Sequence, residues 1–225
     1  MISNRNKKWI IAGLVVLLLV IDQAIKFYVK LHMMIGESIP MFGHSQWAQI
    51  LFIENNGMAF GMQLGGVAGK LFLSLFRLVL IGLIIWYINI LITKKKAPWG
   101  VLIGGALILM GAIGNMIDST FYGKIFSQSS YTNVAQLVPF GNGYAPLLCG
   151  KVVDMFYFPV YHTVLPSWFP FWGGEDFEFF RPIFNFSDAC ISCGVLYLII
   201  FQYKFFSTQS AAASDSKPEE KEVEE

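Results

Sequence analysis

The stretch WIIAGLVVLLLVIDQAIKFY, from Trp9 to Tyr28, decides the fold class. It holds about 20 residues, and a helix of that length, at ~1.5 Å rise per residue, crosses the ~30 Å hydrocarbon core of a bilayer. The rest of the chain agrees, because 55% of its 225 residues are hydrophobic and only 14% are charged. Soluble domains carry about a quarter charged residues. The sequence therefore predicts a membrane-spanning protein and excludes the ordinary soluble enzyme folds.

A cleavable secretory signal is the alternative interpretation of this first stretch. Arg5, Lys7 and Lys8 precede it, as they would in a signal peptide. However, no small-x-small cleavage site follows before the bulky sequence LHMMI. We therefore expect the segment to remain as a membrane helix.

Three further apolar stretches predict three more spans. With the first span at about 9–28, we expect the others at about 71–92, 99–117 and 188–206. Lysines are enriched in cytoplasmic loops, so the cluster at 94–96 places the turn between the second and third spans inside. Both termini then face the cytoplasm, and segments 30–70 and 119–186 lie outside.

The two outer segments differ in character. A β-rich run from Trp47 to Ile53 precedes an Asn-Asn-Gly turn signal, which predicts a small extracytoplasmic β-element. The enlarged outer loop, 119–186, is rich in aromatic residues and prolines, which suits the membrane surface. Its part Leu165–Phe180 is expected to form a mobile flap over a cleft, with a passive surface loop as the alternative.

The overall prediction is an all-α membrane protein with four transmembrane helices. Residues 1–206 form one membrane domain, and residues 207–225 form an acidic cytoplasmic tail without apolar periodicity, which we expect to be disordered. Glycines at 100 and 104 within the third span favour close helix packing.

Several catalytic classes lack their residues. The three histidines are scattered and form no HExxH motif, so a zinc peptidase lacks its ligands, and we expect neither metal nor cofactor. Cys190 and Cys193 lie within the fourth span, where packing is the simpler explanation of a single CxxC. No serine lies in a Gly-x-Ser-x-Gly setting or beside an evident base.

Acidic residues within or beside apolar segments are the remaining signal, because a charge in the membrane is costly. Asp22 and Lys26 lie four apart on one helix face and can form an ion pair, while Asn115 and Asp118 share the face of another helix. A structural role is as plausible as a chemical one for these four residues. Asp154 and Asp188 interrupt apolar sequence and lack an evident neutralising partner apart from Lys151. Two facing carboxylates would share one proton, as in an aspartic protease.

The polar motifs occur in the order DQAIK (22–26), NNGMAFG (55–61), GAIGNMID (111–118), GKVVDMF (150–156) and FNFSDACI (184–191). In this order they resemble bacterial lipoprotein signal peptidase, also called signal peptidase II. The resemblance implies a four-helix aspartic endopeptidase whose catalytic pair is Asp154 and Asp188. It implies supporting or substrate-binding roles for Asp22, Lys26, Asn55, Gly57, Asn115, Asp118 and Asn185.

The resemblance also implies the reaction and its setting. The enzyme would cut prolipoproteins on the amino side of a diacylglyceryl-modified cysteine, in the bacterial inner membrane and near its outer face. Its partners would be lipid-modified signal peptides and membrane lipids; we expect a monomer and no nucleic acid. Ser119, Lys151 and Ser187 depart from the residues frequent in the family, and insertions separate the acidic residues more widely than usual, so substrate clamping is expected to differ.

A small transporter or assembly factor is the competing hypothesis. Its membrane carboxylates, Asp22, Asp118 and Asp188, would form a proton or cation path. Four spans without a visible inverted repeat or broken helices favour the peptidase.

Overall fold

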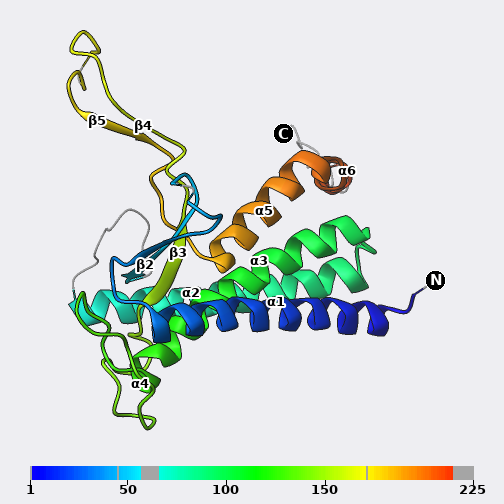
Figure 1. The fold of residues 1–225 in the computed structure, drawn as a ribbon. Coiled ribbons are helices and arrows are strands. Elements are labelled where there is room, and N and C mark those ends of the chain that lie inside the picture. Colours follow the sequence, from blue (N-terminus) through cyan, green and yellow to red (C-terminus); the bar gives the residue numbers. More distant parts are fainter. Residues whose placement is uncertain (1, 45, 57–65, 171, 215–225) are drawn as a thin grey trace, which may run out of the picture.

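Helix α3 lies at the centre of the molecule. The computed structural model describes residues 2–44, 46–56, 66–170 and 172–214. The helices are α1 (Asn4–His32), α2 (Gly66–Thr93), α3 (Trp99–Ile117), the π-helical turn η2 (Asp118–Tyr122), α4 (Gly123–Ile125), α5 (Phe186–Phe201) and α6 (Tyr203–Ser214). The strands are β1 (Ser38–Pro40), β2 (Gln49–Asn55), β3 (Val152–Tyr157), β4 (Tyr161–Val164) and β5 (Asp176–Phe179). Helix α3 contacts α1, α2 and α5 (Figure 1).

Three helical segments are long and apolar enough to cross a membrane by length and composition: α1, α2 and the helical run Trp99–Ile125. Their outward side chains include the exposed Val20, Phe72 and Trp86. Apolar side chains on the outside of a helix bundle are expected where lipid is the solvent. The three segments coincide with the first three expected spans.

The fourth expected span differs from the structure. Helix α5 has 16 residues, so it is about 24 Å long at ~1.5 Å per residue, and the backbone leaves the helical region at Gln202 (φ −118°, ψ 8°). A second helix, α6, then continues to Ser214. Residues 207–214, which we expected to be disordered, are therefore helical; their three consecutive alanines have the highest helix propensity.

Glycines let α5 approach α3 closely. A Cβ atom at Gly111 would lie 2.2 Å from the Ser187 carbonyl oxygen, and one at Gly194 would lie 2.9 Å from the Gly104 carbonyl oxygen. Both separations are too short for a side-chain carbon. Close packing at the Gly100–Gly104 motif is thus confirmed, and it extends to the residues that precede Asp188.

A three-stranded antiparallel sheet in the order β1-β2-β3 lies at one end of the helices. Strand β2 confirms the β-element expected around residues 47–53, whereas β3 was not expected. Ile53 of β2 is opposite Asp154 of β3. The buried Phe52 and Val153 pack with Val29 of α1, which fixes the sheet on the end of the bundle.

The rest of the enlarged outer loop forms a β-hairpin. Strands β4 and β5 pair with Tyr161 opposite Phe179 and Val164 opposite Asp176. This hairpin projects away from the helices and from the start of α5 in Figure 1. The expected flap over a cleft is therefore a projecting hairpin in this structure, and Gly174 adopts a positive φ of 85° in its turn.

Candidate active site

Asp154 is positioned by strand pairing. Its strand, VVDMFY, is rich in β-branched and aromatic residues, which favour the extended backbone. The side chain of Asn55, on the neighbouring strand β2, donates a hydrogen bond to Asp154 Oδ2. Only 3% of Asp154 is exposed. The carboxyl group is therefore held at the inner face of the sheet, out of bulk water.

Asp188 is positioned by the cap of a helix. Asn185 is the N-cap of α5, and its Oδ1 accepts a hydrogen bond from the Asp188 backbone N–H at 2.9 Å. In return, the Asn185 backbone N–H donates to Asp188 Oδ2 at 3.3 Å. This reciprocal capping box begins the helix and fixes the carboxylate in its first turn. The motif FNFSD thus serves local folding as well as the site.

Two asparagine side chains bridge the two carboxyl groups. Asn185 Nδ2 donates to Asp154 Oδ1 at 2.6 Å and to Asn115 Oδ1 at 3.1 Å. Asn115 Nδ2 donates to Asp188 Oδ1 at 2.8 Å. Asp154 and Asp188, 34 positions apart in the sequence, are therefore joined through amides from α3 and from the N-cap of α5.

A buried lysine orients this bridge. Lys26 Nζ lies 3.1 Å from Asp22 Oδ2 and 2.9 Å from Asp118 Oδ2, and all three side chains are fully buried. The same ammonium donates to Asn115 Oδ1 at 3.1 Å. Since the Asn115 oxygen faces Lys26, its NH₂ group must face Asp188. The expected Asp22–Lys26 pair therefore exists, and Asp118 completes it.

Asp22 and Asp118 also hold the elements that carry the two bridged carboxyl groups. Asp22 Oδ1 accepts from the Ser187 backbone N–H at 3.0 Å, next to Asp188. Asp118 Oδ2 accepts from the Val153 backbone N–H at 3.3 Å, next to Asp154. Asp118 begins the π-helical turn η2, a local widening that is frequent at functional sites.

Burial and a neighbouring charge raise the pKa of one of the two carboxyl groups. Burial, followed by repulsion from Asp188, raises the pKa of Asp154 to about 8. Asp188 is only partly buried. At neutral pH burial therefore favours the protonated form of the Asp154 carboxyl group.

Two polar residues of this region, Gln23 and Arg77, were missed in the sequence. Gln23 Nε2 donates to Asp22 at 3.0 Å and to Asp118 at 3.1 Å. Arg77 Nη1 donates a hydrogen bond to Ser119 Oγ at 3.5 Å. An amide beside an aspartate in the first span and a lone arginine in the second were the available signals. Arg77 therefore brings a positive charge from α2 close to Ser119 of η2.

The structure does not place the remaining candidate residues in this site. Gly57 lies outside the described residues. Cys149, Cys190 and Cys193 are free thiols. Within the described part of the chain, no group of three or more His, Cys, Asp or Glu side chains could hold a metal ion.

Apolar helices that hold two bridged carboxyl groups at one end define a class of protein, the membrane aspartic peptidases. The sequence comparison gives the family: the model described as signal peptidase (SPase) II matches residues 14–204. The chain therefore belongs to the signal peptidase II family.

Relatives and solved structures agree with this assignment. The chain is similar to the lipoprotein signal peptidase of Porphyromonas gingivalis, with 50% identity over 88% of this chain and 85% of the relative. It is 35% identical to the lipoprotein signal peptidase of Amoebophilus asiaticus, over 87% and 78% of the two chains. A bacterial membrane enzyme solved at 2.3 Å has the same fold, with a TM-score of 0.54, 22% identity and coverage of 95% of this chain and 94% of its own.

Proposed function

We propose that this protein removes signal peptides from prolipoproteins in the bacterial inner membrane, with Asp154 and Asp188 as the catalytic pair. The observation that carries this proposal is the amide bridge through Asn115 and Asn185, which joins the two carboxyl groups where the sheet meets the apolar helices. The signal peptidase II family and the lipoprotein signal peptidases similar to this chain support the reaction. They give no support to a transporter or an assembly factor.

A pair of aspartates that holds one proton, on Asp154, suits a two-step hydrolysis. Asp188 takes a proton from water as the water oxygen attacks the scissile carbonyl carbon, and Asp154 gives its proton to the carbonyl oxygen. In the second step Asp188 protonates the leaving nitrogen, and Asp154 recovers its proton from the tetrahedral intermediate as the C–N bond breaks. Both aspartates return to their starting states, and neither step needs a metal or a cofactor.

The remaining residues would position this pair and the substrate. Lys26, with Asp22 and Asp118, would keep Asn115 oriented toward Asp188. Asn55 would keep Asp154 in place, and Gly57 follows on the same segment as a candidate substrate contact. Cleavage on the amino side of a diacylglyceryl-modified cysteine fits a site at the end of apolar helices, because acyl chains can approach from the lipid.

The membrane arrangement belongs to the same proposal. Residues 1–206 would form one monomeric membrane domain, in which α5 and the start of α6 complete a fourth span. Residues 207–225 would form a cytoplasmic tail. Both termini would lie on the cytoplasmic side, because the basic flanks of α1 and the Lys94–Lys96 cluster favour it. The catalytic pair would then lie near the outer face, with membrane lipids around the helices.

The decisive experiment uses purified full-length protein and a diacylglyceryl-modified precursor. Asp154→Asn and Asp188→Asn should each lose nearly all signal-peptide release, because an amide can neither take nor share the proton. Asp176→Asn, which changes an exposed carboxylate in the same outer segment, is the matched control and should cleave like the parent. A folded Asp154→Asn or Asp188→Asn variant that cleaves near the parental rate would exclude this catalytic pair.

A further inference from the structure

The β4–β5 hairpin has two chemically different faces. Residues directly opposite each other in an antiparallel pair share a face, and so do residues two positions apart on a strand. Tyr161 lies opposite Phe179, and Thr163 lies opposite Phe177, so these four residues form one largely aromatic face. Asp176 and Glu178 lie on the other face. The hairpin is therefore amphipathic across its thickness.

The aromatic face and the tip of the hairpin are uncovered. Tyr161, Phe177 and Phe179 are all exposed, and the tip adds Trp168 at 78% and Trp172 at 56% exposure. An exposed aromatic surface of this kind indicates contact with lipid or with another protein, because soluble proteins rarely expose one. Tryptophan in particular is enriched at the headgroup level of membranes.

Contacts at its base hold the hairpin in a defined direction. Phe180 packs edge-on against Phe184, with ring centroids 6.1 Å apart, and Phe158 lies 5.8 Å from the same ring. The Tyr157 hydroxyl on β3 donates a hydrogen bond to the Glu178 carboxylate. The hairpin leaves the bundle beside the start of α5 and runs across the direction of α1 and α3 (Figure 1). An element that crosses the helix direction at their end runs along the membrane surface.

We propose that the β4–β5 hairpin is a membrane-surface anchor whose aromatic face and tip tryptophans bind the headgroup region of the bilayer beside the catalytic pair. The hairpin joins the strand of Asp154 to the cap of Asp188, so it fixes the depth of both carboxyl groups relative to the lipid. The acidic residues Glu175, Asp176 and Glu178 repel anionic headgroups. The lipid that fits is therefore zwitterionic.

Tryptophan fluorescence of full-length protein in phosphatidylcholine nanodiscs tests this anchor. The emission of the parent minus that of the double variant Trp168→Phe/Trp172→Phe reports the two tip tryptophans. We expect this difference emission to be blue-shifted, strongly quenched by phosphatidylcholine brominated near the headgroup end of its chains, and weakly quenched by acrylamide. The readout needs no cleavage, so it stands or falls separately from the proposed function.

Two controls and two contrary outcomes make the result decisive. Replacing part of the phosphatidylcholine with an anionic lipid should leave the bromine quenching unchanged or weaker; quenching that requires the anionic lipid would overturn the zwitterionic assignment. Difference emission that is red-shifted and quenched by acrylamide alone would overturn the anchor. Blue-shifted emission without bromine quenching would show that the tip contacts protein, and this result too would overturn it. Trp86→Phe, at a lipid-facing position on α2, supplies the matched reference for quenching in the acyl region.

Discussion

Asp154 and Asp188 have the same side chain and different surroundings. Asp154 is buried on the edge strand β3 and accepts hydrogen bonds from the amides of Asn55 and Asn185, whereas Asp188 lies in the first turn of α5 and is partly exposed. The sequence predicted both residues, because each interrupts an apolar run. It could not predict which one carries the proton, since that depends on burial created by residues distant in the chain.

The raised pKa of Asp154 predicts a pH-dependent stability. The folded pKa of about 8 exceeds the unfolded value of about 3.9, so the folded state holds the proton more tightly. The stabilising contribution is complete below the unfolded pKa and is lost as the pH rises through about 8. Asn cannot ionise, so Asp154→Asn should gain in unfolding temperature relative to the parent as the pH rises. Thermal unfolding in detergent across this pH window measures the difference.

The informative quantity is how the difference in unfolding temperature between Asp154→Asn and the parent changes with pH, and not the size of that difference at one pH. Asn at 154 also loses an acceptor for one of the two neighbouring amides, which lowers stability equally at every pH. Asp176→Asn, an exposed change, should show no such slope. A pH-independent difference between Asp154→Asn and the parent would mean that Asp154 ionises as easily in the folded protein as in the unfolded chain.

At the scale of elements, the α3–α5 seam and the sheet bring the site together. Ser187 and Asp22 fill the space that a side chain at Gly114 of α3 would occupy, so α1, α3 and α5 meet at this glycine. The sequence predicted the helices from hydrophobicity and their close packing from small residues. Strand β3 was missed, because GKVVDMF resembles the apolar membrane segments and its partner β2 lies about 100 residues earlier.

Gly114→Ala tests the seam. Its Cβ would lie 2.0 Å from Ser187 Oγ and 2.8 Å from Asp22 Oδ2, so α5 must move away from α3. Overpacking of this kind costs about 1–3 kcal/mol. Cleavage should also fall, since Asp188 moves with α5. Gly82→Ala, on α2 with nothing within 4 Å, should leave unfolding temperature and cleavage near the parental values. Equal behaviour of the two variants would contradict the seam.

A second ionic cluster, separate from Asp154 and Asp188, links α1 to β2. Lys30 is fully buried and forms an ion pair with Glu54, while Lys151 Nζ lies 3.5 Å from Glu54 Oε2. Ser129 Oγ lies 3.0 Å from Lys30 Nζ. Glu54 immediately precedes Asn55, the residue that holds Asp154. The cluster therefore helps to hold the part of β2 that contacts Asp154.

Glu54→Gln should destabilise the protein by about 3–5 kcal/mol, because it leaves the buried Lys30 ammonium without its carboxylate. Cleavage should fall as Asn55 loses its fixed place. The double variant Lys30→Met/Glu54→Met removes both charges and should recover most of the lost stability. Denaturant unfolding of the parent, single and double variants measures this; a double variant no more stable than the single one would show that the ion pair itself is not the cause.

At the scale of the whole molecule, the apolar helices and the polar end of the bundle have different roles. The described helices provide the membrane body, and the sheet, η2 and the caps of α5 assemble the carboxyl groups at one end (Figure 1). Hydropathy predicted this division well. It overestimated the length of the last helix, because apolar residues continue on both sides of Gln202 and only the backbone at that residue shows that the helix stops.

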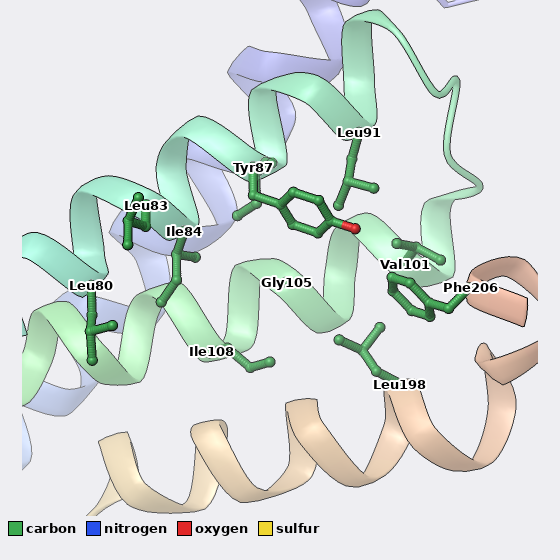
Figure 2. A pocket seen from close by; sticks show the side chains of 11 residues that line it. Leu80, Leu83, Ile84, Tyr87, Leu91, Val101, Gly105, Ile108, Leu198 and Phe206 are labelled. Atoms are coloured by element: carbon green, nitrogen blue, oxygen red, sulfur yellow. The ribbon is translucent and has the colours of Figure 1, made fainter. Parts of the chain in front are cut away.

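An apolar groove lies between α2, α3, α5 and α6, close to the point where the short helix α5 ends. Tyr87, Val101 and Leu198 line this groove together with Phe206 of α6, and its volume is about 300 Å³ (Figure 2). Helix α6 thus continues the apolar contact that α5 leaves after Phe201.

Cysteine labelling tests the orientation of the helices. After the three native cysteines are replaced with alanine, Lys95→Cys should resist an impermeant maleimide added outside intact cells, whereas Tyr131→Cys should react. The physical reason is the preference of lysine-rich turns for the cytoplasmic side. Permeabilised cells are the control, in which both positions should label. Reaction of Lys95→Cys in intact cells would reverse the orientation.

The two bridged carboxyl groups are held by separate elements, one on β3 and one at the cap of α5, and the hairpin connects these elements. The entropy cost of closing a loop rises only logarithmically, by about 0.6 kcal/mol for each doubling of its length. Evolution could therefore lengthen, shorten or replace this connection without rebuilding the chemistry. The same latitude allows related enzymes to diverge in how they meet their membranes while keeping one reaction.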